Sequence, residues 1–157
     1  MSWPRFSRNF GFRTVAVWLL IALVESLHGT LRVLLIAPAI GDLPARRLGF
    51  VIACALILVI AWLTARWLDA RTRAAQWSAG AVWVVLMFAF EIGIGLLQGF
   101  GWPRIMQEFD PRQGGLMALG MLILLMAPAF GAGVTARKSH LPSTGKVDAK
   151  ADTKVRP

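Results

Sequence analysis

Long runs of apolar residues divide the chain into four segments of similar length. The runs cover residues 14–37, 48–68, 76–100 and 115–134. Crossing about 30 Å of hydrocarbon takes roughly 20 helical residues, and each run meets that requirement. No stretch shows the alternation of apolar and polar residues that is typical of a membrane-barrel strand. The pattern therefore predicts an all-α integral membrane protein, a four-helix transmembrane bundle.

Short connectors separate the four runs, and the first and third of them contain Pro and Gly. The first contains Pro38, Gly41 and Pro44, the second covers 69–73, and the third covers 102–114. Pro and Gly interrupt regular structure, so these segments are predicted to be loops at the membrane surfaces.

Basic residues are distributed unevenly between the two sides of the predicted bundle. The chain has 17 Lys and Arg against 8 Asp and Glu, for a net charge of +9. Twelve of them fall in the N-terminal flank, in or just before the second connector, and in the C-terminal tail: Arg5, Arg8, Arg13, Arg66, Arg71, Arg73, Arg137, Lys138, Lys146, Lys150, Lys154 and Arg156. The first and third connectors hold four: Arg46, Arg47, Arg104 and Arg112. Because Lys and Arg accumulate in cytoplasmic flanks, both termini are predicted to be cytoplasmic in a bacterial inner membrane.

The two ends of the chain differ in composition from the transmembrane domain, 14–136. Residues 1–13 combine Trp3 and three phenylalanines with three arginines, which is typical of an interfacial segment at headgroup level. Residues 137–157 are rich in Lys, Ser, Thr and Pro, which predicts a disordered basic cytoplasmic tail. We expect its charge to attract it to anionic lipid, and we do not expect a nucleic-acid partner.

Three ionisable residues interrupt the first apolar run. Around a helix, His28 lies about 60° from Glu25 and Arg32 about 20° from it, so the three share one face. An ionised Glu or Arg at the bilayer centre costs about 2.5–3.5 kcal/mol. The face is therefore predicted to point into the bundle rather than towards lipid.

The third apolar run contains the predicted partners of this face, Glu91 and Gln98. If both runs start at the same membrane surface, Glu91 falls within one helical turn of the depth of Arg32. We therefore predict an ion pair between Arg32 and Glu91. Gly95 and Gly99 are four residues apart, a spacing of small residues that permits close helix packing.

Two carboxylates and one arginine leave one acid of the predicted cluster without a permanent cation. Glu25 is then protonated, paired with a protonated His28, or bound to a cation. One hypothesis is structural, in which the buried charges only fix how the helices pack. Another is a proton- or ion-coupled role, and a third is ligand or lipid-headgroup binding. A metal site is not predicted, because Arg32 competes for the same acids.

Polar residues of the first and third connectors are predicted to form an outer mouth over this cluster. Pro103 is well placed to open a short helix on which Arg104 and Glu108 lie four residues apart. Acids and arginines occur together here, which indicates either salt bridges between the loops or a mouth that binds an anionic headgroup or a peptide. The predicted residues are Asp42, Arg46, Arg47, Trp102, Arg104, Glu108 and Asp110.

Several polar motifs follow one another between Glu25 and Pro128. They are HGTLR, APAIGDLPAR, FEIGIG and a Trp-Pro turn that precedes GGL. This order resembles a group of small four-span bacterial inner-membrane proteins without an assigned activity. The resemblance implies no reaction, and it implies that six residues belong to the pattern of the group: His28, Arg32, Asp42, Arg46, Glu91 and Trp102.

Catalytic signatures are missing from the sequence. It has no glycine-rich phosphate loop, nucleophile elbow or histidine-rich metal helix, and the single Cys54 excludes an internal disulfide. We therefore expect a non-enzymatic accessory or binding protein without a cofactor. Its expected partners are the lipid bilayer and either a second copy of the chain or another membrane protein. The alternative is a small proton- or cation-coupled transporter or channel that uses Glu25.

Overall fold

The computed structural model describes residues 8–107, 109, 110 and 115–139, and every regular element in this part of the chain is helical. The elements are α1 (Arg8–Leu31), the π-helical turn η1 (Arg32–Ile36), α2 (Ala37–Ile40), α3 (Asp42–Leu68), α4 (Arg73–Leu97), α5 (Trp102–Gln107) and α6 (Met117–Ser139). The all-α prediction is confirmed.

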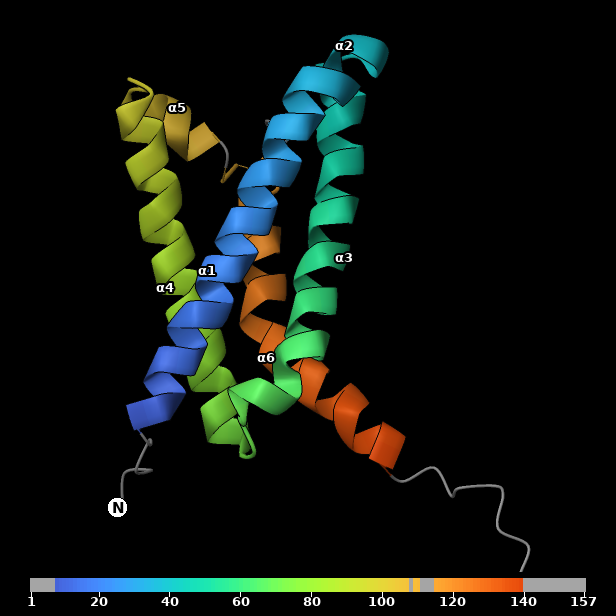
Figure 1. The fold of residues 1–157 in the computed structure, drawn as a ribbon. Helices are drawn as coiled ribbons and strands as arrows, with labels where there is room; N and C mark the ends of the chain where they lie inside the picture. The colour runs from blue at the N-terminus through green and yellow to red at the C-terminus, as the bar shows by residue number, and fades with distance from the viewer. Residues whose placement is uncertain (1–7, 108, 111–114, 140–157) are drawn as a thin grey trace, which may run out of the picture.

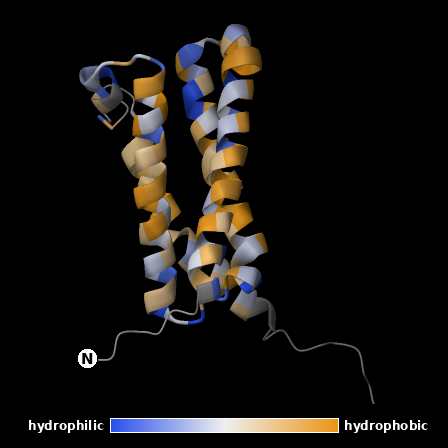
Figure 2. Cartoon of the chain, turned by 60° about the vertical axis from the view of Figure 1, so that its left-hand side comes forward, coloured by the Kyte–Doolittle hydropathy of each residue, from blue (hydrophilic) through white to orange (hydrophobic). Residues whose placement is uncertain are grey.

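Four helical segments are long and apolar enough to cross a membrane: Asn9–Ile40, Asp42–Leu68, Arg73–Leu97 and Met117–Ala136. In Figure 1 the start of α1 and the end of α6 lie at one end of the bundle, and α2 and α5 lie at the other. We call the first the basic end, because it carries Arg13, Arg66, Arg71 and Arg73, and the second the α5 end. Figure 2 shows apolar residues along the middle of the helices and hydrophilic residues at both ends.

The first connector departs most from the prediction. A loop was expected over 38–47, whereas α3 begins at Asp42 and Gly41 alone separates it from α2. Pro44 lies in the first turn of α3, where its missing N–H breaks no helical hydrogen bond, whereas Pro38 lies in α2, which continues α1 and η1 without a break to Ile40. Gly41 makes the turn with φ 89° and ψ 158°, a conformation that side-chain-bearing residues rarely adopt.

The π-helical turn η1 has a physical cause in Pro38. In a regular α-helix the proline ring would clash with the carbonyl of Leu34, four residues earlier. The wider turn avoids this clash, and the Ala37 N–H donates to the Arg32 carbonyl, five residues back. Side chains from Arg32 onwards are therefore displaced around the axis relative to a regular continuation of α1.

The end of α4 also differs from the predicted boundary at residue 100. The Phe100 N–H donates to the Gly95 carbonyl and the Gly99 N–H to the Leu96 carbonyl, both at 3.0 Å. Together with the φ of 75° at Gly99, these bonds form a Schellman cap that ends the helix. Gly99 is thus a helix terminator in the described chain, and nothing lies within 4 Å of a Cβ at this position, so it contacts no other helix of the described residues. Gly95 lies within α4 and is buried.

The predicted end segments are only partly described. α1 begins at Arg8, so the second half of the predicted interfacial segment 1–13 is helical. α6 reaches Ser139, beyond the predicted end of the last run at 134 and into the segment 137–157 predicted to be disordered. The rest of both predictions concerns 1–7 and 140–157, which lie outside the described residues.

The buried core lies in the half of the bundle nearer the basic end. Its largest fully buried side chains are Trp83, Ile21, Leu68, Leu124 and Val17. Trp83 is 0% exposed, and its Nε1–H donates to the Thr14 carbonyl at 2.8 Å, which links α4 to α1. Towards the α5 end, α4 diverges from α1 and α3 in both views (Figures 1 and 2).

Two glycines permit close approach of the helix backbones. A Cβ at Gly80 in α4 would overlap the Leu125 carbonyl of α6. A Cβ at Gly131 in α6 would lie 2.5 Å from the Ala61 carbonyl oxygen of α3. A backbone carbonyl in a helix cannot rotate away as a side chain can, so these two contacts require glycine.

Gly80→Ala and Gly131→Ala are each expected to lower the free energy of unfolding by about 1–3 kcal/mol, the typical cost of overpacking. Gly133→Ala is the matched control in α6, because nothing lies within 4 Å of a Cβ at that position. It is expected to be neutral or slightly stabilising, since Ala favours helix over Gly. Unfolding of the purified variants in mixed micelles measures the difference. Equal changes in the free energy of unfolding for Gly131→Ala and Gly133→Ala would contradict the close approach of α6 to α3.

Candidate functional site

A polar stripe runs along one face of α1 into η1. We call Trp18, Glu25, His28 and Arg32 the α1 stripe; their spacing keeps them within an arc of about 80° over roughly 20 Å. The exposed fractions of the side chains are 18% for Glu25, 14% for His28 and 22% for Arg32. The Trp18 indole packs edge-on against Phe90 of α4, with ring centroids 6.3 Å apart. The stripe therefore faces the interior of the bundle.

Glu25 and His28 are brought together one helical turn apart. The Nδ1 of His28 lies 3.6 Å from the Oε2 of Glu25. This distance is too long for a hydrogen bond, although it gives a strong charge interaction when the imidazole is protonated.

Arg32 faces α3 rather than α4. Its Nη1 lies 3.9 Å from the Oδ1 of Asp42, and its Cδ lies 2.5 Å from the place of a Cβ at Gly49. The predicted ion pair between Arg32 and Glu91 is therefore wrong. The one-residue turn at Gly41 sets the start of α3 beside η1, and the π turn displaces Arg32 around the helix axis.

The predicted residues on α4 occupy different positions. The charge of Glu91 acts on Glu25, so the structure brings the two carboxylates into electrostatic range. Gln98 is the exposed C-cap residue of α4, beyond the last helical turn, and does not join the stripe.

Sequence reasoning missed Cys54. This partly buried thiol on α3 also experiences the charge of Glu25. Its neighbours in the sequence are aliphatic and carry no signal of this proximity, which arises from the packing of α3 on α1.

Four polar atoms of the α1 stripe are buried and have no hydrogen-bond partner within the described residues. They are Trp18 Nε1, Glu25 Oε1, His28 Nε2 and Arg32 Nη1. Elsewhere in the bundle, Trp83 and Gln76 are buried with their donors bonded to backbone carbonyls. An unpaired buried polar group costs about 1–3 kcal/mol, and native proteins contain few of them. Their concentration on one helix face marks the stripe as the candidate site.

The chemistry of these four atoms is mixed. Trp18 and Arg32 donate, Glu25 accepts when ionised, and the His28 Nε2 does either according to its protonation. Among the described residues, no three His, Cys, Asp or Glu side chains are arranged to hold a metal ion. The stripe is therefore suited to a polar group that offers acceptors and donors together.

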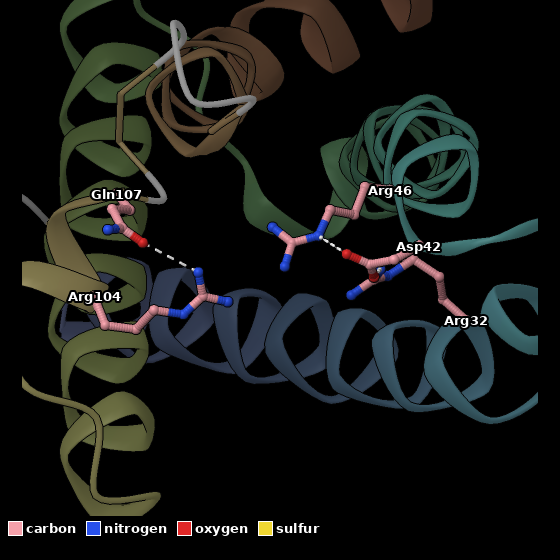
Figure 3. A network of polar contacts seen from close by, with 5 residues as sticks. All are labelled: Arg32, Asp42, Arg46, Arg104 and Gln107. Carbon is pink, nitrogen blue, oxygen red and sulfur yellow. Dashed lines mark hydrogen bonds and ion pairs between the residues drawn. The ribbon is translucent and has the colours of Figure 1, made fainter.

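The predicted outer mouth is assembled in part. Asp42 accepts a hydrogen bond from the Nε of Arg46 at 2.9 Å and also faces Arg32 (Figure 3). Arg104 donates to the Oε1 of Gln107 at 3.2 Å on α5, and its guanidinium and that of Arg46 point towards one another in Figure 3.

The other predicted mouth residues lie on or beside α3 and α5. Arg47 and Trp102 are exposed, and Asp110 follows α5 with its N–H bonded to the Gln107 carbonyl. Glu108, the predicted partner of Arg104, lies outside the described residues.

Comparisons of the chain with protein-family models, curated proteins and solved structures give no match. The resemblance to a group of small four-span membrane proteins therefore stays a prediction. The function is inferred below from the geometry of the site.

Gly49→Ala is expected to displace the Arg32 side chain from α3 and to lower the free energy of unfolding by about 1–3 kcal/mol. In an Arg32→Ala background, Gly49→Ala should lower the free energy of unfolding by a smaller amount. The coupling energy between the two substitutions should be about 0.5–3 kcal/mol. Gly120→Ala is the control, because the nearest atom to a Cβ there is the Phe50 Cε2 at 3.9 Å. Strictly additive effects of Gly49→Ala and Arg32→Ala would rule out the contact.

Proposed function

We propose that the chain is a non-enzymatic protein of the bacterial inner membrane, with both termini cytoplasmic, that binds a polar group of a membrane partner at the α1 stripe. The main support is the set of four buried polar atoms along the α1 stripe that have no hydrogen-bond partner among the described residues. The excess of basic residues in the flanks of the basic end supports the orientation.

A side chain of another transmembrane helix matches the chemistry of the stripe. An amide or hydroxyl group can both donate and accept hydrogen bonds. It therefore suits a site in which Glu25 accepts and Arg32 donates. Within hydrocarbon, such a group forms hydrogen bonds between helices because water is absent. An accessory subunit is the role that this chemistry favours.

Trp18→Phe and Trp83→Phe make the same chemical change in two environments. Trp83→Phe removes a hydrogen bond to Thr14 and is expected to lower the free energy of unfolding by about 0.5–1.5 kcal/mol. Trp18→Phe removes an unpaired buried N–H and is expected to leave that free energy unchanged or raise it by up to about 1–3 kcal/mol. Unfolding of the purified protein in mixed micelles measures both. Equal losses would show that the Trp18 N–H is satisfied in the isolated protein and would remove the main support for the proposal.

Partner binding can be detected with a photoreactive amino acid at position 29 in native membranes. Nothing lies within 4 Å of a Cβ at Gly29, which is one residue from His28, so the probe fits without disturbing the stripe. We expect a protein adduct of defined mass that disappears with Glu25→Gln. A probe at Leu27, which is 60% exposed, is the control and should give lipid adducts. Lipid adducts alone at both positions would contradict the proposal.

A second candidate function, proton- or cation-coupled transport with Glu25 as carrier, is favoured by the Glu25–His28 pair. Neighbouring titratable groups inside a membrane are typical of proton relays. Proton uptake into liposomes that is present in wild type and lost in a folded Glu25→Gln variant would support this function. A folded wild-type protein that takes up no protons would exclude it.

A further inference from the structure

A cavity opens at the basic end, and none of its lining residues belongs to the α1 stripe. It has a volume of about 840 Å³ and lies between the end of α3, the start of α4 and the last turns of α6. Its polar lining includes Arg66, Asp69, Arg71, Arg73 and Gln76. The volume lies within the range of about 300–1,000 Å³ that is typical of ligand pockets. We call it the basic cavity.

The basic cavity has more positive than negative charge. Three arginines against one aspartate leave an excess of two positive charges. Arg71 donates from its Nε to the Oδ1 of Asp69 at 2.6 Å, and this hydrogen bond, with the carboxylate charge, raises the pKa of Arg71. Arg66 and Arg73 have no ion-pair partner among the described residues. Two guanidinium groups are thus available for an anion.

The turn that carries these arginines is held in place by short-range contacts. Asp69 ends α3 in the left-handed conformation, with φ 55°, and its N–H donates to the Ala65 carbonyl at 3.2 Å. The buried Gln76 donates from its Nε2 to the Ala70 carbonyl at 3.1 Å. The position of Arg71 and Arg73 relative to α3 is therefore set before any ligand binds.

The surroundings place the cavity at the depth of lipid headgroups. Trp67 and Trp77 are 45% and 46% exposed on the adjoining turns, and tryptophan accumulates at membrane interfaces. Deeper in the bundle the wall of the cavity is apolar and includes Leu63, Ala129 and Ala132. An occupant with an anionic head and an apolar chain matches both parts of this lining.

We propose that the basic cavity binds the phosphate-bearing headgroup of an anionic phospholipid, with Arg66 and Arg73 as the direct contacts. The planar fork of arginine fits the oxygens of a phosphate. Inorganic phosphate has the same oxygens, whereas the apolar wall selects the lipid. This site is independent of the α1 stripe and of the function proposed for it.

The test is native mass spectrometry of the purified full chain with phosphatidylglycerol or phosphatidylcholine. Arg66→Gln and Arg73→Gln should each weaken phosphatidylglycerol binding about fivefold, the contribution of one basic residue near an anionic membrane surface. Arg13→Gln is the matched control at the same end: it removes the same charge from a guanidinium that lies 5.8 Å from the Trp67 ring centroid. It should leave phosphatidylglycerol binding unchanged, and phosphatidylcholine should bind weakly to all variants.

Weaker phosphatidylglycerol binding by Arg66→Gln and Arg73→Gln, with unchanged binding by Arg13→Gln, supports the proposal. Equal losses in all three would show diffuse attraction to a basic surface and would overturn it. Displacement of phosphatidylglycerol by an equal concentration of inorganic phosphate would overturn the assignment to lipid. Arg73→Lys keeps the positive charge but lacks the planar guanidinium, so it should bind phosphatidylglycerol with an affinity between those of wild type and Arg73→Gln. This intermediate affinity distinguishes loss of the contact from loss of the fold.

Discussion

The arrangement of the bundle depends on the burial of one indole. Trp83 is fully enclosed, and the only polar atom of its side chain is bonded to the backbone of α1 at Thr14. Because the indole is enclosed by the protein, water cannot replace this bond, which therefore fixes the rotation of α4 about its axis relative to α1. Phe90, two turns along α4, then meets Trp18, and Glu91 comes within range of Glu25. The surroundings of the α1 stripe therefore follow from a contact outside it.

Local features of the chain were predictable, and features that arise from packing were not. The four apolar runs predicted four helices because length and hydrophobicity suffice for that inference. The proximity of Glu25 and His28 is a property of a single helix and follows from their spacing. Pro38 and Pro44 were interpreted as breakers, whereas Pro44 fits the first turn of α3 and the π turn η1 accommodates Pro38 within a continuous helix. Their sequence context alone does not distinguish these two roles.

The partner of Arg32 illustrates why the rest was missed. The direction of the Arg32 side chain depends on a π turn caused by Pro38 and on the turn at Gly41. The sequence features that determine this direction are therefore spread over ten residues. The position of Cys54 near Glu25 and the close approaches at Gly80 and Gly131 depend on which helices are neighbours. A single sequence carries no signal for that choice.

The tight turn at Gly41 bears on how the chain enters the membrane during synthesis. Arg32 and Asp42 are ten residues apart, so the carboxylate emerges from the ribosome about a second after the guanidinium, at roughly 5–20 residues per second. In the helical hairpin formed by the first two apolar segments, the Asp42 carboxylate lies 3.9 Å from the Arg32 guanidinium and also accepts a hydrogen bond from Arg46. For a first segment that carries three ionisable residues and is long enough to cross a bilayer, a carboxylate that follows directly behind it would offset part of the cost of the Arg32 charge.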